Sequence, residues 1–129
     1  MRRLCPEKET YQLSPDEQAR LEHVIDPAIV LKALKDEKAL AADATWKSVS
    51  FSKPKESATC PSGYTGRVGI YEVLPVTATI KELMLKNATN DSIEAQARSE
   101  GMLTMSEDGI FRAAQGATTI EEVLRVITE

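Results

Sequence analysis

The 129-residue sequence predicts a predominantly helical α+β protein in three parts: a small N-terminal α/β subdomain, one core-type strand and a C-terminal bundle of three to four short helices. Two observations predict this class. Helix-start signals recur along the chain, whereas only one stretch has the composition of a buried strand. All six glycines lie at position 63 or later and all six prolines at position 75 or earlier, which marks a change in composition. We therefore expect subdomains over 1–62 and 76–129, joined by a turn and strand over 63–75.

The composition argues against several classes of function. With 42% hydrophobic and 28% charged residues, the chain is typical of a globular protein. Sixteen basic against twenty acidic residues give a net charge of −4, which argues against nucleic acid as the main partner. No apolar run reaches the roughly 18 residues of a membrane span, and residues 1–5 lack the apolar region of a signal peptide. We expect a cytoplasmic protein without direct membrane insertion.

Two helices are predicted early in the chain. Residues 14–17 combine a capping serine, a proline suited to the first helical position and a glutamate that can close a capping box. This helix should run to about Ile25. Residues 26–27 (Asp-Pro) start a second helix in the same way, with apolar residues at helical spacing after it.

The rest of the N-terminal part carries weaker signals. Residues 1–13 show no regular pattern and are expected to be irregular. Residues 44–51 alternate enough to predict a short strand, with Trp46, the only tryptophan, as an anchor of a small core. Residues 52–57 are polar and contain a proline, which predicts a loop.

The predicted central strand covers residues 68–74. Gly63 and Gly66 before it are typical of a turn. The strand residues are mostly β-branched, aromatic or apolar, and apolar side chains fall on both faces. Pro75 should end the strand. A strand buried on both faces needs neighbouring strands, and the rest of the chain offers too few.

Four helix starts follow the strand. Capping boxes fit residues 79–82 (TIKE), 104–107 (TMSE) and 118–121 (TTIE), and Thr89 or Asn90 can cap a helix between the first two. Gly101 and Gly116 are expected to end helices. Gly109 lies inside the third of these helices, where glycine costs about 1 kcal/mol against alanine. We expect it to allow a neighbouring helix to approach closely.

The sequence lacks the motifs of common enzyme sites. It contains neither the phosphate-binding G-x-x-x-x-G-K-[ST] loop nor the G-x-S-x-G nucleophile motif. His23 is the only histidine, and a lone histidine on a helix is usually a surface residue. The carboxylates are numerous, but none is distinguished by its neighbours. We therefore expect no catalytic residue and no cofactor-binding residue in this chain.

The two cysteines leave more than one interpretation open. Structural zinc takes four ligands, usually from CxxC pairs, but Cys5 and Cys60 are followed at +3 by Lys8 and Gly63. With His23, the chain offers three candidate ligands from separate places, so we expect no zinc site. Cys5 and Cys60 are then either buried thiols or a redox pair, which requires Cα atoms within about 7 Å.

Several segments in one order carry a resemblance to a known family. They are RLCP at 3–6, GYTGRVGIYEVLP at 63–75, EGM at 100–102, DG at 108–109 and GATTIEEVLRV at 116–126. This set resembles the C-terminal end of the type II secretion and type IV pilus assembly ATPases. The resemblance extends over nearly the whole chain. It is strongest from Gly63 onward and weak between residues 10 and 57.

The resemblance implies a part of a hexameric, RecA-like cytoplasmic motor. In this family, hydrolysis of Mg²⁺–ATP drives pilus or pseudopilus assembly through an inner-membrane platform protein. The nucleotide motifs lie upstream of the matching part, which holds a tetracysteine zinc insertion, the returning strand of the ATPase core and a helical bundle. The strand over 68–74 would then pair with a core absent from this chain. Implied partners are that core, neighbouring subunits and, indirectly, the inner-membrane platform protein. The chain itself would be cytoplasmic and peripheral at the cytoplasmic face of the inner membrane.

The sequence departs from the family pattern at the zinc insertion. Lys8 stands where the second cysteine of the first pair would be, and the second pair is reduced to Cys60. Cys5 and Cys60 thus resemble remnants of a tetracysteine site, and zinc binding does not carry over. No catalytic residue carries over either. Arg67 matches a motif position close to the core and is a candidate interface or nucleotide-proximal residue.

Two functional hypotheses follow. In the first, the chain is a structural and coupling module of a secretion or pilus ATPase, without hydrolysis of its own. It would be either part of a longer ATPase or a free-standing module that docks on one. The alternative is a free-standing cytoplasmic interaction or thiol redox-sensing module, with Cys5 and Cys60 as the switch.

Overall fold

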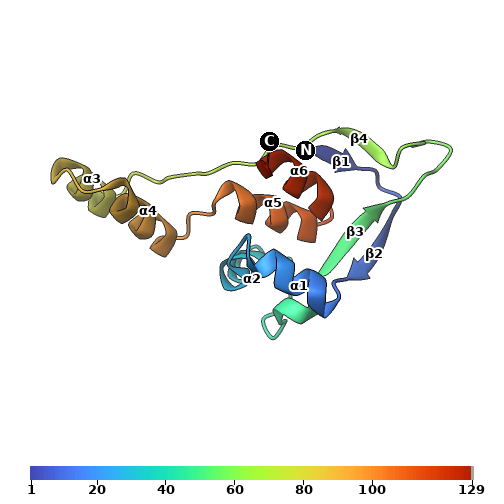
Figure 1. Cartoon of the computed structure of the whole chain (residues 1–129), viewed down its shortest axis with the longest axis horizontal. Coiled ribbons are helices and arrows are strands. Elements are labelled where there is room, and N and C mark those ends of the chain that lie inside the picture. The colour runs from blue at the N-terminus through green and yellow to red at the C-terminus, as the bar shows by residue number, and fades with distance from the viewer. Residues whose placement is uncertain (129) are drawn as a thin grey trace.

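A computed structural model describes residues 1–128; residue 129, the last of the predicted helical bundle, lies outside the described residues (Figure 1). The strands are β1 (Arg2–Leu4), β2 (Lys8–Gln12), β3 (Ser50–Pro54) and β4 (Tyr64–Arg67). The helices are α1 (Pro15–Glu22), α2 (Pro27–Asp36), the short 3₁₀ helix η1 (Trp46–Ser48), α3 (Ala78–Leu85), α4 (Asn90–Ser99), α5 (Met105–Ala114) and α6 (Ile120–Thr128). The predicted fold class, α+β and mostly helical, is confirmed. No helix within residues 1–128 is long and apolar enough to span a membrane.

Two small antiparallel sheets are present, one of β1 with β4 and one of β2 with β3. The expectation that residues 1–13 are irregular is therefore wrong. Their strands carry few buried side chains and form because β3 and β4 supply backbone partners. The predicted loop over 52–57 is also wrong at its start, because Ser52–Pro54 continues β3 opposite Lys8–Thr10.

One hydrophobic core joins the two ends of the chain. Its buried members are Leu13, Leu21, Ile25, Val30, Leu34, Val49, Phe51, Ile110, Ala113, Ile120 and Val123. Helices α5 and α6 pack on each other, and α5 also packs on α2 and β3. The division into 1–62, 63–75 and 76–129 stays a prediction, and the core packing within this chain crosses it.

The sequence signals for helix starts are borne out in four cases. Ser14, Asp26, Thr89 and Thr104 cap α1, α2, α4 and α5 with their side-chain oxygens, and Ser14 and Thr104 complete capping boxes. Two starts are displaced. Thr77, not Thr79, caps α3, and the Thr119 hydroxyl accepts from the Glu122 amide at the start of α6, one residue after the predicted cap.

Gly109 makes the close contact between α5 and α6. A Cβ built at Gly109 would lie 2.5 Å from Cγ1 of Val123, which is fully buried. This distance is far below van der Waals contact, so only glycine fits without movement of α6. The expected close helix approach is confirmed.

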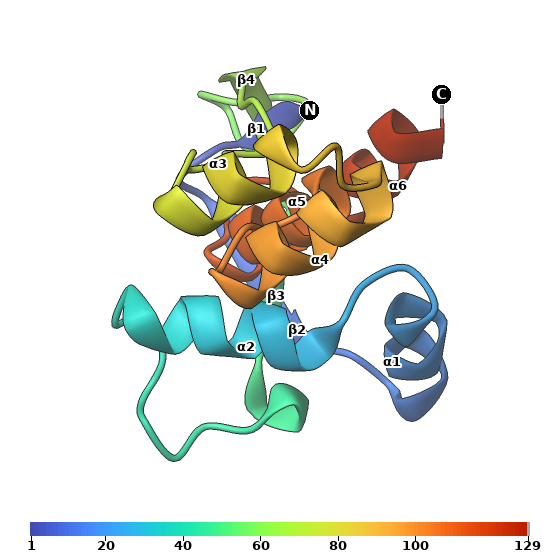
Figure 2. The ribbon, with the colours of Figure 1, turned by 90° about the vertical axis from the view of Figure 1, so that its left-hand side faces the viewer.

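Helices α3 and α4 form a hairpin at one end of the molecule (Figures 1 and 2). They pack on each other, whereas α5 and α6 belong to the main core. Residues 68–76 connect β4 to this hairpin as an extended segment with no strand assignment. The predicted strand over 68–74 is therefore wrong for this chain: the strand lies at Tyr64–Arg67, and in the described part of the chain the residues after it have no neighbouring strand to pair with.

A buried carboxylate fixes β1 on α6. The side chain of Glu122 is 2% exposed and accepts from the Arg2 backbone amide at 2.8 Å and from the Arg2 guanidinium at 2.7 and 2.9 Å. It also accepts from Arg125 at 3.0 and 3.3 Å. The hydroxyl of Thr118 donates to the Arg2 carbonyl, and the Leu4 amide donates to the Ala117 carbonyl. The hydrogen bonds from Arg125 and Arg2 outweigh burial and lower the pKa of Glu122 from 4.5 to about 2.

This pKa shift predicts an acid-sensitive term in stability. Because the folded-state pKa lies below the unfolded value, the stabilisation is complete above pH 4.5 and is lost as pH falls toward about 2. The shift corresponds to about 3 kcal/mol. We expect Glu122→Gln to remove most of this pH dependence, measured by urea unfolding across that range. Glu121→Gln, at the exposed neighbouring position, should retain it, and equal pH profiles for the two variants would contradict the assignment.

Candidate docking segment

Residues 68–76, which we call the docking segment, form the most exposed apolar stretch of the molecule. The segment leaves β4 and runs along the α5–α6 pair to the start of α3 (Figure 1). Tyr71 and Val73 are 60% and 69% exposed, and Leu74 and Val76 are also exposed. Its composition favours a strand, yet no strand of this chain pairs with it within the described residues.

The side chains of the docking segment alternate between two sides, as they do in a strand. Tyr71 and Val73 line a hollow of about 200 Å³ that also involves Leu103 and Asp108. Glu72 and Leu74 line a different hollow, against α4. The segment is thus held in the extended conformation that addition to a sheet requires.

Three hydrogen-bonded positions hold the segment on the protein. Val68 and Met1 exchange backbone hydrogen bonds of 3.0 and 3.1 Å. The Tyr71 amide donates to Oδ2 of Asp108 at 3.0 Å. Glu72 accepts through Oε1 from the Met105 amide, also at 3.0 Å. A few contacts to Met1 and to α5 therefore position a segment in which Tyr71, Val73, Leu74 and Val76 remain exposed.

Asp108 is the central residue of this arrangement. Its Oδ2 accepts both from the Tyr71 amide and from Nε of Arg112, the latter at 2.8 Å. The Arg112 guanidinium lies 5.6 Å from the centre of the Tyr71 ring, within cation–π range. Asp108 is buried, so the carboxylate ties the segment to α5 through a charge-assisted bond rather than a solvated one.

The residue before the docking segment is the sequence-predicted candidate Arg67. It lies exposed in β4, opposite Arg2 in the β1–β4 sheet. It is thus adjacent in sequence to the segment but takes no part in the Asp108 arrangement. His23 lies exposed at the C-cap of α1, on a separate element. Asp108 carried no distinguishing signal in the sequence apart from its place in the DG pair.

Cys5 and Cys60 are joined by a disulfide, with Cα atoms 6.7 Å apart. Of the alternatives left open by the sequence, free buried thiols are thereby excluded for this structure. Within residues 1–128, no cluster of three or more histidine, cysteine, aspartate or glutamate side chains has the arrangement of a metal site. The residues present do not fit the tetracysteine zinc site of the resembled family.

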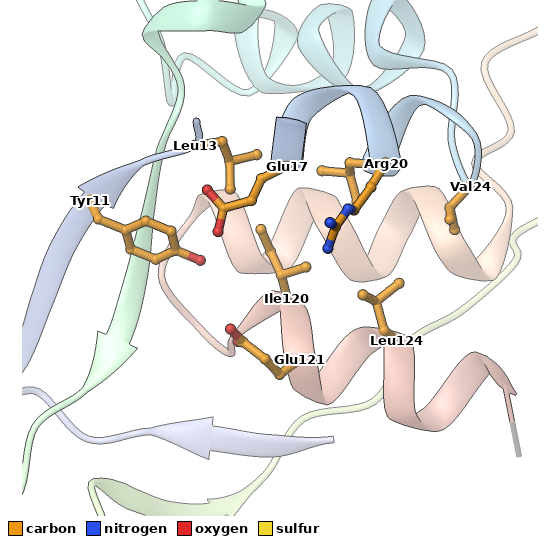
Figure 3. A pocket seen from close by; sticks show the side chains of 9 residues that line it. Tyr11, Leu13, Glu17, Arg20, Val24, Ile120, Glu121 and Leu124 are labelled. Atoms are coloured by element: carbon orange, nitrogen blue, oxygen red, sulfur yellow. The ribbon is translucent and has the colours of Figure 1, made fainter. Parts of the chain in front are cut away.

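A separate groove of about 260 Å³ lies between α1 and α6 (Figure 3). Leu13, Leu21 and Ile120 are among its apolar lining residues, and Glu17 and Glu121 stand at its edge with Tyr11. Burial, followed by these two carboxylates, raises the pKa of Tyr11 to about 12. Tyr11 therefore stays protonated at neutral pH. No residue of the docking segment lines this groove.

The role assigned to Asp108 predicts a local loosening when it is removed. In Asp108→Ala we expect the Tyr71 amide to exchange hydrogen about tenfold faster relative to the buried amides of α2, because a bond to a charged acceptor is lost. Asp43→Ala, an exposed loop aspartate, serves as the matched control. Amide-resolved hydrogen exchange measures both variants. An unchanged ratio in Asp108→Ala would show that the segment is held by other contacts.

Comparison with known proteins identifies a family that the chain resembles over nearly its whole length. The family model described as type II/IV secretion system protein matches residues 1–125. The chain is 45% identical over 74 residues to type II secretion system protein E of Xanthomonas campestris pv. campestris, covering 57% of this chain and 13% of that protein. It is 42% identical over 67 residues to the type IV pilus assembly ATPase PilB of Pseudomonas aeruginosa, covering 52% of this chain and 12% of that protein. It is 31% identical over 123 residues to the type IV pilus assembly ATPase PilB of Myxococcus xanthus, covering 95% of this chain and 19% of that protein.

The chain thus spans less than one fifth of the length of these relatives. The match to the family model nevertheless extends over nearly all of it. On this evidence the chain belongs to the family of type II/IV secretion system proteins.

Proposed function

We propose that the chain is the C-terminal structural and coupling module of a type II secretion or type IV pilus assembly ATPase. The observation that carries the proposal is the docking segment, which is extended, apolar and without a strand partner. In the proposed assembly it adds as a strand to the sheet of the ATPase core. The names of the relatives, a secretion protein E and pilus assembly ATPases, support this choice of partner.

The geometry suggests how such a module transmits motion. The segment joins the α5–α6 pair to the α3–α4 hairpin. An ATPase core bound along the segment would therefore contact both the α5–α6 pair and the hairpin. Asp108 and Glu72 connect it to the start of α5, which is rigid because Gly109 packs directly on α6. A displacement of the ATPase-core strand that pairs with the segment would then be transmitted to α5 through these polar contacts rather than through a flexible linker.

The proposal assigns nucleotide chemistry to the motor rather than to this module. ATP and Mg²⁺ would be held by the ATPase core, and Arg67, directly before the docking segment, would lie at the interface with it. Neighbouring subunits of a hexamer and, indirectly, an inner-membrane platform protein are the further partners. The module would act on the cytoplasmic side, either within a longer ATPase or docked on one.

The first test locates the partner of the docking segment in source cells. A photo-crosslinking amino acid in place of Val73 should form crosslinks to peptides of an ATPase core, identified by mass spectrometry. The same amino acid in place of Val24, an exposed valine just after α1, is the matched control and should not. The experiment serves both forms of the proposal, because the crosslink is within one polypeptide or between two. Crosslinks that avoid the core, or that are equal at both positions, would overturn it.

The second test concerns hydrolysis. We expect the purified chain to turn over no ATP, since it contains no phosphate-binding loop. The measurement is phosphate release against a matched blank. Turnover that persists at constant specific activity through further purification would contradict the assignment of catalysis to the motor.

A further inference from the structure

We propose that the Cys5–Cys60 disulfide is a thiol-exchange site whose reduction loosens β4 and, with it, the root of the docking segment. The reactant would be a dithiol reductant. The consequence for docking rests on the function proposed above, whereas the loosening of β4 does not. The inference stands on the position of the bond, on what else holds β4, and on access to the sulfur atoms.

The bond lies at one end of the β1–β4 sheet. Cys5 directly follows Leu4, the last residue of β1, and Cys60 precedes Tyr64, the first residue of β4, by four positions. The Cys5 amide donates to the Gly63 carbonyl at 3.0 Å, and Sγ of Cys60 lies 3.5 Å from the Tyr64 carbonyl oxygen. The disulfide thus covalently ties the turn that leads into β4 to the end of β1.

The two strands of this sheet are held very differently. β1 has its own anchors on the rest of the protein: Arg2 on Glu122, the Arg2 carbonyl on Thr118, and the Leu4 amide on Ala117. These contacts remain when the disulfide is broken. β1 therefore forms a fixed support against which β4 can be attached or released.

β4 depends mainly on β1. Beyond its backbone pairing, Tyr64 is covered by the Arg2 guanidinium at 4.1 Å and approaches the Thr119 hydroxyl at 3.4 Å. The following residues, 65–67, are exposed and lead directly into the docking segment. Without the disulfide, this strand is kept in place by a short irregular pairing with β1, by the Cys5–Gly63 and Met1–Val68 backbone bonds at its two ends, and by the contacts of Tyr64 with Arg2 and Thr119. Short two-stranded pairs are marginally stable in water, so the covalent link contributes a large share of the order here.

A hollow in the surface leads to the disulfide, although both cysteines are buried. Cys5 is 3% and Cys60 8% exposed, yet both line an open hollow of about 370 Å³. Glu7, Thr59, Pro61 and Thr65 around this hollow are exposed. An attacking thiolate can enter through the hollow, and Cys60 is the more accessible of the two cysteines.

The exchange balances without a further reactant. A thiolate of the dithiol attacks Sγ of Cys60, a mixed disulfide forms, and the Sγ–Sγ bond breaks with Cys5 leaving as a thiolate that takes up a proton. The second thiolate of the reductant then attacks its own partner sulfur in the mixed disulfide and releases Cys60 as a thiol. Two electrons pass to the chain, and the reductant ends as an internal disulfide.

Hydrogen exchange on the full chain tests the loosening of β4. With excess dithiothreitol under native conditions, alkylation and mass measurement should count two free thiols, and the amide of Val68, which donates to the Met1 carbonyl, should exchange about tenfold faster or more. The buried amides of α2 and α5 should be unchanged. The double variant Cys5→Ser/Cys60→Ser is the control and should exchange at the fast rate with or without reductant.

Three results would overturn the proposal. The bond stays intact under excess reductant, or both thiols are freed while β4 exchange is unchanged, or all helices exchange faster together. The last result would identify a purely structural crosslink whose loss unfolds the protein.

The link to docking has a separate readout. The crosslink from position 73 to an ATPase core should fall when cells are treated with dithiothreitol, relative to untreated cells. If that crosslink is absent in both states, the proposed function fails and the exchange result stands. If it is present and equal in both states while β4 exchange changes, control of docking by the disulfide is overturned.

Discussion

The position of the N-terminal strand depends on one buried carboxylate. Glu122 accepts from the backbone and side chain of Arg2 and from the side chain of Arg125. A buried charge that loses its partners costs several kcal/mol, so β1 and α6 stabilise each other's placement. β1 in turn pairs with β4 and leads into Cys5. The sheet, the disulfide and the start of the docking segment therefore all take their position from this ion pair, which joins residues 120 positions apart.

A second set of constraints meets at the start of α5, where three successive residues contact three different elements. Glu107 receives a hydrogen bond from Arg98 of α4, Asp108 binds the docking segment, and Gly109 contacts Val123 of α6. Successive residues of a helix point about 100° apart, which allows neighbouring positions to serve different partners. Helix α5 is thus the common support of the hairpin, the segment and the C-terminal helix.

The helix starts could be predicted from the sequence because caps such as Ser14 are local, and their chemistry lies within four residues. The strands were less predictable. Composition reports what residues 68–74 can form, whereas a strand also needs a partner, and residues 1–128 supply none to them. The polar residues that hold the docking segment and β1 were harder to predict than the strands. Asp108 and Glu122 are two of twenty acidic residues, and their importance comes from partners 37 and 120 positions away. The burial of these two carboxylates and their distant partners are decided by tertiary packing, which local sequence patterns do not encode.

The two ends of the α3–α4 hairpin are hydrogen-bonded to each other where the hairpin joins the rest of the protein. The hydroxyl of Thr77, which caps α3, donates to Oε1 of Glu100, the C-cap of α4, at 3.1 Å, so the two ends of the hairpin meet. None of the buried residues of the main core comes from the two helices. The hairpin is therefore a cassette. Its helices could be lengthened, shortened or exchanged for others between Thr77 and Arg98, which keeps its bond to the buried Glu107 of α5, while the core, the sheet and the disulfide keep their geometry. One scaffold could then present different surfaces to different partners.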